Sequence, residues 1–136
     1  DRFITPFLAR YDVNSRTLHY INAGHAPPLM LSNGEAIPLK NGCTVLGWMP
    51  DLPFLEIGGV CLTHEATIFT YTDGLTDVQN DAGEAFEEEK LIAFLRANAH
   101  LTARQLNTNL LNHVEAYREH QPFPDDITVL TFKAFV

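Results

Sequence analysis

The first half of the chain consists of short apolar runs separated by turn residues, a pattern that predicts β-strands joined by tight turns. Residues 3–11 and 17–23 are rich in aromatic and β-branched side chains, and the stretch 12–16 between them is typical of a turn. The two runs therefore predict a hairpin. Apolar side chains fall on both parities of these strands, which favours a sheet covered on both faces.

Glycine and proline mark the next boundaries. Asn33-Gly34 separates the apolar segments 29–31 and 36–39 and predicts a second hairpin, because both turn residues accept a positive φ. Residues 41–53 are interrupted by glycines and prolines and predict a loop, in which Trp48 is expected to pack against a small core.

Two further strands are predicted at about 54–63 and 66–72, and Gly58-Gly59 indicates a bulge in the first of them. The chain contains no internal repeat and no low-complexity stretch. The strand-rich region is expected to end near residue 72, because the pattern becomes helical after it.

The second half has helical periodicity. Apolar residues at i, i+3 and i+4 spacing predict a helix over 87–98, whose acidic first turn, 87–89, suits the positive end of the helix dipole and is expected to be solvated rather than metal-binding. A second helix is expected to begin at Thr102, with Gln105 completing a capping box. Residues 127–136 predict a final strand. This order of elements indicates an α+β fold in a single domain over residues 1–136.

Composition narrows the class of protein. Nine basic and 17 acidic residues give a formal net charge of −8 and a pI near 5.0, which disfavours nucleic-acid binding. No apolar run approaches the ~20 residues needed to enter and cross a membrane. Cys43 and Cys61 are too few for a disulfide framework and are expected to be buried thiols in the reducing cytoplasm. The chain opens without methionine in a strand-like run, so we expect it to be a segment of a longer protein.

Two acidic segments are the strongest candidates for chemistry. Asp73 follows a buried-looking strand and precedes a glycine, and Asp77 faces the same way if a helical turn begins here. Asp125 and Asp126 stand at the mouth of the final strand, where a hard divalent cation relieves their mutual repulsion. The alternative is structural: Asp-Gly is a common turn pair, aspartate is a common helix N-cap, and an Asp-Asp pair before a strand is compatible with a solvated loop.

His25 is a third candidate. It lies between Gly24 and the Ala26-Pro27-Pro28 stretch and must project from a stiff loop. A general acid, a substrate contact and a loop anchor all remain open for it. The other histidines lack zinc-ligand spacing.

Together these segments resemble a known family. The sequence looks like the carboxyl-terminal part of bacterial SpoIIE/RsbU-type serine phosphatases, which belong to the metal-dependent PPM group and are similar to type-2C phosphatases. The resemblance covers essentially the whole chain. The motifs that carry it are Tyr20-Ile21-Asn22-Ala23-Gly24-His25-Ala26-Pro27-Pro28, Leu46-Gly47, Tyr71-Thr72-Asp73-Gly74, Gly83-Glu84-Ala85-Phe86 and Asp125-Asp126-Ile127-Thr128.

The resemblance implies an α-β-β-α sandwich with a paired Mn²⁺ or Mg²⁺ site at one end of its sheets. It implies that Asp73 and Asp125 are metal ligands. By the same resemblance Asp126 is a neighbour that tunes the site, and Asp77 lies where a third, weaker metal binds. His25 falls near the place where related enzymes carry an acidic residue beside the metals.

The implied reaction is hydrolysis of phosphoserine or phosphothreonine by water that two metals activate. Typical substrates of the family are phosphorylated anti-anti-sigma (STAS-domain) proteins in partner-switching pathways. The upstream family motif Gly-Asp-Val-x-Gly-His/Lys-Gly does not occur in these residues, so we expect the domain to be partial and weakly active or inactive by itself. Exposed strand edges then favour a homodimer. The competing hypothesis is a non-catalytic, degenerate phosphatase module that binds a signalling partner.

Overall fold

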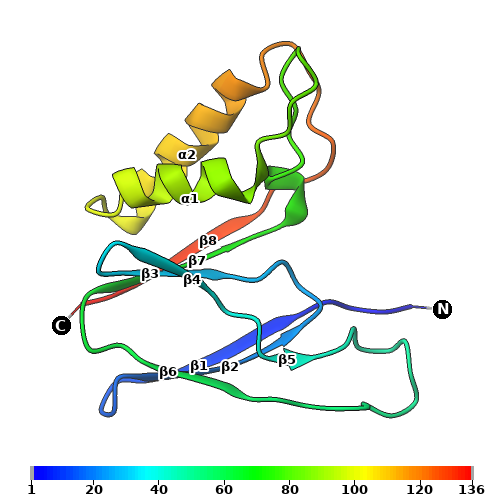
Figure 1. Ribbon diagram of the computed structural model, residues 1–136, viewed down its shortest axis with the longest axis vertical. Coiled ribbons are helices and arrows are strands. Elements are labelled where there is room, and N and C mark those ends of the chain that lie inside the picture. The colour runs from blue at the N-terminus through cyan, green and yellow to red at the C-terminus, as the bar shows by residue number, and fades with distance from the viewer. Residues whose placement is uncertain (1, 136) are drawn as a thin grey trace.

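The computed structural model describes residues 2–135 and arranges them in three layers: one helical layer above two stacked sheets (Figure 1). The α+β class predicted from the sequence is confirmed. In chain order the elements are β1 (Phe7–Asp12), β2 (Thr17–Ala23), β3 (Leu29–Ser32), β4 (Glu35–Pro38), β5 (Gly42–Cys43), β6 (Gly58–Cys61), β7 (Ala66–Tyr71), the short 3₁₀ helix η1 (Asp73–Leu75), α1 (Glu87–Ala97), α2 (Ala103–Tyr117) and β8 (Val129–Ala134).

The first sheet grows from the predicted amino-terminal hairpin. β1 pairs antiparallel with β2, and the turn between them is fixed by the Asp12 carboxylate, which accepts a hydrogen bond from the Ser15 amide at 2.9 Å. On its other side β2 pairs antiparallel with β6 and parallel with the two-residue β5. The hairpin is confirmed, whereas the strand predicted at 54–63 is reduced to β6.

The second sheet has the order β4-β3-β7-β8 and is antiparallel throughout. The turn between β3 and β4 has φ values of 51° at Asn33 and 79° at Gly34, as the hairpin prediction requires. The last strand, β8, pairs along its whole length with β7, although about sixty residues separate the two in sequence.

The central strands of this sheet bury both faces. On β7, Ile68 packs between the two sheets, while Phe69 and Tyr71 pack against the helices. On β3, Met30 faces the other sheet and Leu29 faces the helices. This alternation explains why the sequence of these strands is apolar at nearly every position.

Both helices cover the second sheet. The capping box of α2 is confirmed: the Gln105 amide donates to the Thr102 hydroxyl oxygen, and the Gln105 side chain accepts from the Thr102 amide. In the acidic first turn of α1, Glu88 accepts a hydrogen bond from the Tyr71 hydroxyl. Neither helix within residues 2–135 has the length and apolar character of a membrane-crossing segment.

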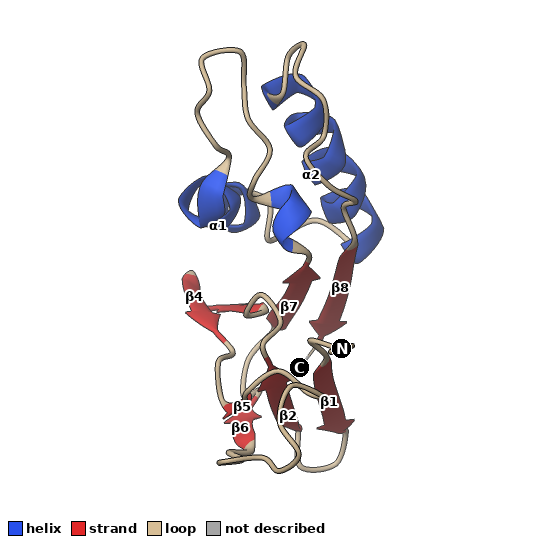
Figure 2. Ribbon diagram, turned by 90° about the vertical axis from the view of Figure 1, so that its right-hand side faces the viewer, coloured by secondary structure: helices blue, strands red, loops and turns tan. Residues whose placement is uncertain are grey.

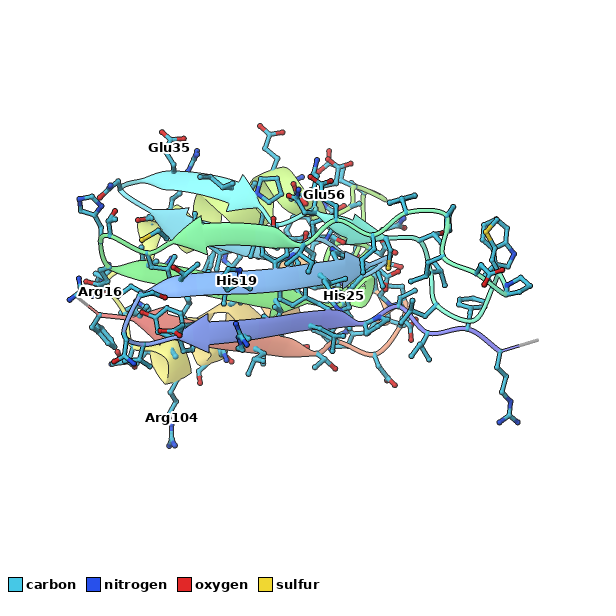
Figure 3. The ribbon with its side chains drawn as sticks, turned by 90° about the horizontal axis from the view of Figure 1, so that it is seen from below. Arg16, His19, His25, Glu35, Glu56 and Arg104 are labelled. Carbon is cyan, nitrogen blue, oxygen red and sulfur yellow. The ribbon has the colours of Figure 1, made fainter. Side chains whose placement is uncertain are left out.

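The outer face of the first sheet carries no helix from residues 2–135, and Figure 3, which views this face directly, shows the strands in front. The side chain of Leu8 is 57% exposed and projects there beside the exposed His19. The prediction that both faces of the amino-terminal strands are covered is therefore wrong within these residues. The described residues therefore form three of the four layers of the expected α-β-β-α sandwich, namely one helical layer and both sheets.

Three smaller expectations also need correction. Gly58 and Gly59 form regular pairs with β2 rather than a bulge, and a side chain at Gly58 would meet the Tyr20 ring at 2.3 Å, so close packing explains that glycine. Trp48 packs into no core, because it is 68% exposed. Both thiols are free, but neither is buried, because Cys43 is half-buried and Cys61 is exposed.

Candidate metal centre

The two acidic segments predicted from the sequence lie side by side. The end of β7 and the segment leading into β8 meet beneath the helices, where the short η1 helix begins (Figure 2). The Thr72 amide donates to the Thr128 carbonyl at 3.1 Å, which extends the β7–β8 pairing toward the acidic residues. A Cβ atom on Gly74 would lie 2.5 Å from the Asp126 carbonyl oxygen, so the backbones almost touch. The structure thus brings together Asp73 and the Asp125–Asp126 pair.

Asp73 begins a short helical turn, the condition on which the sequence lets Asp77 face the same way as Asp73. The Asp77 amide donates to the Asp73 carbonyl at 3.0 Å, and the Thr76 hydroxyl donates to the same oxygen at 3.1 Å. This turn carries the chain from the sheet into the loop that precedes α1. Asp77 therefore follows Asp73 by one turn.

The four carboxylates are exposed and largely uncommitted. Within residues 2–135 no hydrogen bond or ion pair engages the side-chain oxygens of Asp73, Asp77 or Asp126, and Asp125 Oδ1 accepts only from the Asp126 amide at 2.7 Å. Carboxylate oxygens are the donors that Mn²⁺ and Mg²⁺ prefer, so the chemistry of this set fits such an ion. However, no three His, Cys, Asp or Glu side chains in the described part of the chain are grouped closely enough to hold a metal by themselves. These residues therefore fit as part of a centre.

His25 lies in a tightly held loop after β2, and no hydrogen bond joins it to the acidic segments (Figure 3). Its amide donates to the buried Asn22 side chain at 2.8 Å, and its carbonyl accepts from the same side chain at 3.0 Å. Its ring Nδ1 lies 2.7 Å from the Ala26 carbonyl oxygen. When Nδ1 carries the proton, Nε2 is left for another partner. β2 and β7 end at the same side of the molecule, so the loop and the acidic segments share one end of the sandwich (Figure 1).

A partly buried hydrogen bond lies two residues before Asp73. The Tyr71 hydroxyl donates to Glu88 Oε2 at 2.9 Å and so joins the end of β7 to the start of α1. Burial, together with this carboxylate, raises the pKa of Tyr71 above its ordinary value. The phenol therefore stays protonated at neutral pH and keeps donating.

A surface cluster of hydrogen bonds joins the loop that follows Asp77 to the loop that precedes Asp125. We call this cluster, formed by Asp81, Glu119, His120 and Gln121, the clasp. The Asp81 carboxylate accepts from His120 Nδ1 at 2.7 Å and from the Gln121 side chain at 2.9 Å, and the Asp81 amide donates to Glu119 at 2.9 Å. The hydrogen bond to Asp81 raises the pKa of His120, and the bonds from His120 and Gln121 lower the pKa of Asp81. The clasp therefore favours the charged form of both groups.

The clasp predicts a pH-dependent contribution to stability. The stabilisation from His120 is present below the ordinary histidine pKa of about 6.5 and is lost as the pH rises through the raised pKa of the folded state. The stabilisation from Asp81 is present above the ordinary aspartate pKa of about 3.9 and is lost as the pH falls through the lowered pKa of the folded state. We expect Asp81→Asn to destabilise the protein more at pH 5.5 than at pH 8.5, by a small amount because the pair is exposed. Denaturation midpoints at both pH values measure this. Asp51→Asn, in an exposed loop, is the control; an equal loss for Asp81→Asn at both pH values contradicts the prediction.

Sequence reasoning missed the residues that hold the candidate centre in place. Thr72 and Thr128 form hydrogen bonds between the two acidic segments, and Asn22 holds the His25 loop. The only available signal was their position directly beside the candidate residues. A local pattern does not reveal that residues 72 and 128 are neighbours.

The two stacked sheets, with helices over one of them and acidic residues at one end, define the fold class of PP2C-type phosphatase domains. The SiaA-PP2C domain of Pseudomonas aeruginosa is similar over 94% of this chain, with a TM-score of 0.81 and 25% sequence identity. The phosphatase domain of the cell fate determinant SpoIIE from Bacillus subtilis, in a structure described as Mn presoaked, matches 96% of the chain with a TM-score of 0.71 at 14% identity, which shows the fold.

The family follows from the sequence match. The model of the family described as Stage II sporulation protein E (SpoIIE) matches residues 1–135, and the chain belongs to this family. Protein IcfG of Synechocystis sp. (strain ATCC 27184 / PCC 6803 / Kazusa) is 32% identical in an alignment of 133 residues, and the match covers 94% of this chain. The chain spans 20% of that relative, 50% of the SiaA-PP2C chain and 56% of the SpoIIE chain.

Proposed function

We propose that the chain is part of a metal-dependent protein phosphatase that hydrolyses phosphoserine or phosphothreonine. The observation that carries this proposal is the close approach of the Asp73 and Asp125–Asp126 segments within a chain of the SpoIIE family. Mn²⁺ or Mg²⁺ bound in such a centre activates water for attack on phosphorus and offsets the charge of the phosphoryl oxygens. The Mn presoaked SpoIIE structure supports this class of cofactor.

In this proposal the residues of the chain hold the ion and the substrate. Asp73 and Asp125 supply carboxylate ligands from the two adjacent segments, while Asp126 and Asp77 add negative charge beside them. As a P–O bond to water forms and the bond to the serine or threonine oxygen breaks, the leaving oxygen takes up a proton. His25 is the candidate for donating that proton or contacting the substrate, and the anchor role remains its alternative. Since no three metal-binding groups converge within residues 2–135, the centre needs at least one further ligand.

The substrate we propose is a phosphorylated anti-anti-sigma protein of the STAS type in a bacterial partner-switching pathway. The support is family membership together with the likeness to the SiaA-PP2C domain. Homodimerisation is compatible with the exposed edge strands β1 and β8, because an unpaired strand edge can pair with another chain.

The second candidate function is a non-catalytic module that binds a signalling partner. The observation that favours it is the incomplete ligand set in the described part of the chain. Such a module keeps the fold and the partner surface but hydrolyses nothing. The two functions differ in whether Mn²⁺ supports hydrolysis.

The test is metal dependence in the intact protein that contains this chain. We expect hydrolysis of p-nitrophenyl phosphate with Mn²⁺, no hydrolysis with excess chelator, and a rise in melting temperature with Mn²⁺. An ion present at ten times its Kd stabilises the native state by about 1.4 kcal/mol, which corresponds to a rise of several degrees. If Mn²⁺ produces neither hydrolysis nor a rise in melting temperature, the phosphatase is excluded. A rise in melting temperature without hydrolysis favours the binding module.

A further inference from the structure

One threonine hydroxyl lies between the two acidic segments. Thr72 Oγ1 donates to the Asp126 carbonyl oxygen at 3.2 Å and accepts from the Thr128 amide at 3.0 Å. The Thr72 amide also donates to the Thr128 carbonyl at 3.1 Å. A single residue, directly before Asp73, therefore makes three hydrogen bonds to the segment that follows Asp125.

Gly74 completes the contact on the other side of Asp73. Its buried Cα faces the Asp126 backbone so closely that a Cβ atom would lie 2.5 Å from the carbonyl oxygen. The same carbonyl oxygen accepts the Thr72 hydroxyl. Asp73 is thus held between two residues that both touch the backbone of Asp126.

The acidic side chains by themselves work against this arrangement. Four carboxylates lie on the two segments, and no lysine or arginine forms an ion pair with any of them within residues 2–135. Like charges repel, and repulsion favours separation of the segments when no cation is bound. Hydrogen bonds between the segments oppose that separation.

We propose that Thr72 is a positioning residue whose hydroxyl sets the spacing between Asp73 and the Asp125–Asp126 pair and so prepares these carboxylates for a divalent cation. The part of this proposal that concerns the cation rests on the proposed function. The hydroxyl is suited to the task because it is both donor and acceptor, so it joins a carbonyl and an amide of the opposite segment at once. Outer residues that orient metal ligands typically change metal affinity 10- to 100-fold when they are replaced.

Thr70 provides a matched control. It lies two residues earlier, within β7, and its hydroxyl donates to the Leu130 carbonyl oxygen at 3.1 Å. Thr70 and Leu130 are paired within the regular β7–β8 ladder, so this bond joins the same two strands without touching the acidic segment. Thr70→Val and Thr72→Val each remove one hydroxyl and leave nearly the same volume.

The experiment compares Thr72→Val, Thr70→Val and Thr72→Ser in the intact protein that contains this chain. Mn²⁺ alone is the probe, titrated and followed by electron paramagnetic resonance, and amide hydrogen exchange is measured over residues 125–130 without metal. We expect Thr72→Val to weaken Mn²⁺ binding about tenfold and to speed exchange at Thr128. Thr70→Val is expected to leave both unchanged, and Thr72→Ser to restore both.

Two outcomes overturn the proposal. One is unchanged exchange at Thr128 in Thr72→Val, which shows that the hydroxyl does not hold the segments together. The other is an equal loss of Mn²⁺ affinity in Thr70→Val and Thr72→Val, which shows a general effect of strand pairing. If the unmodified protein binds no Mn²⁺, the proposed function fails at this centre, and the exchange comparison still decides whether Thr72 positions the segments.

Discussion

Asp73→Asn and Asp125→Asn are each expected to reduce Mn²⁺-dependent hydrolysis of an aryl phosphate by at least about 100-fold and to weaken Mn²⁺ binding. Asparagine keeps the size of the side chain but removes its negative charge and one oxygen donor, and hard divalent cations depend on both. Steady-state kinetics in the intact protein, with a Mn²⁺ titration of each variant, measure the two effects. Asp77→Asn is expected to have a smaller effect, because Asp77 lies one turn further from the junction of the segments.

The stability of these variants separates loss of chemistry from loss of folding. Since the carboxylates of both segments are exposed and repel one another, removing one charge is expected to leave the melting temperature without metal unchanged or higher. Asp51→Asn is the matched control, because Asp51 is an exposed aspartate in the loop between β5 and β6, outside both acidic segments. Activity that survives in both Asp73→Asn and Asp125→Asn defeats the assignment of these residues as metal ligands.

Phe86→Ala is expected to lower the free energy of unfolding by about 3–5 kcal/mol, the range for truncation of a buried phenylalanine. Phe86 is fully buried, and its ring packs edge-on against Tyr117 with centroids 5.3 Å apart. Its amide donates to the Val78 carbonyl at 2.7 Å, so the residue also fixes the loop that contains Asp77. The cavity left by the ring lies between that loop and the rings of His113 and Tyr117 on α2.

Denaturant unfolding of the purified variant measures this loss. Phe135→Ala is the control, because Phe135 is 73% exposed and its removal is expected to change stability by less than about 0.5 kcal/mol. A loss below about 1 kcal/mol for Phe86→Ala would show that the loop and helix layer contributes little to the folded state. In that case the position of Asp77 is less firmly fixed than the packing indicates.

Local chemistry made much of the fold predictable. The Asn33-Gly34 turn and the Thr102–Gln105 capping box are formed by residues that contact each other within a few positions, and both appear in the structure as the sequence predicts. The exposure of Trp48 was not predictable in this way, because it depends on which distant segments lie nearby. The same applies to the bare outer face of the first sheet, since apolar strands do not show which residues cover them.

The candidate centre was likewise predictable only in part from local sequence. The placement of Asp73 after a buried strand is a local signal, but its nearness to Asp125 was implied by the family resemblance and not by any local pattern. The hydrogen bonds of Thr72 to Asp126 and Thr128 join residues more than fifty positions apart. Such contacts become visible only when the pairing of β7 with β8 is known.

The pairing of β7 with β8 also sets the order of events during biosynthesis. Tyr71 pairs with Val129, so the strand that ends beside Asp73 gains this neighbour only after residue 129 has been translated. Nascent polypeptides, and products clipped before residue 129, carry Asp73 without the strand that aligns it. The acidic end of the molecule can therefore assemble only after β8 has been synthesised.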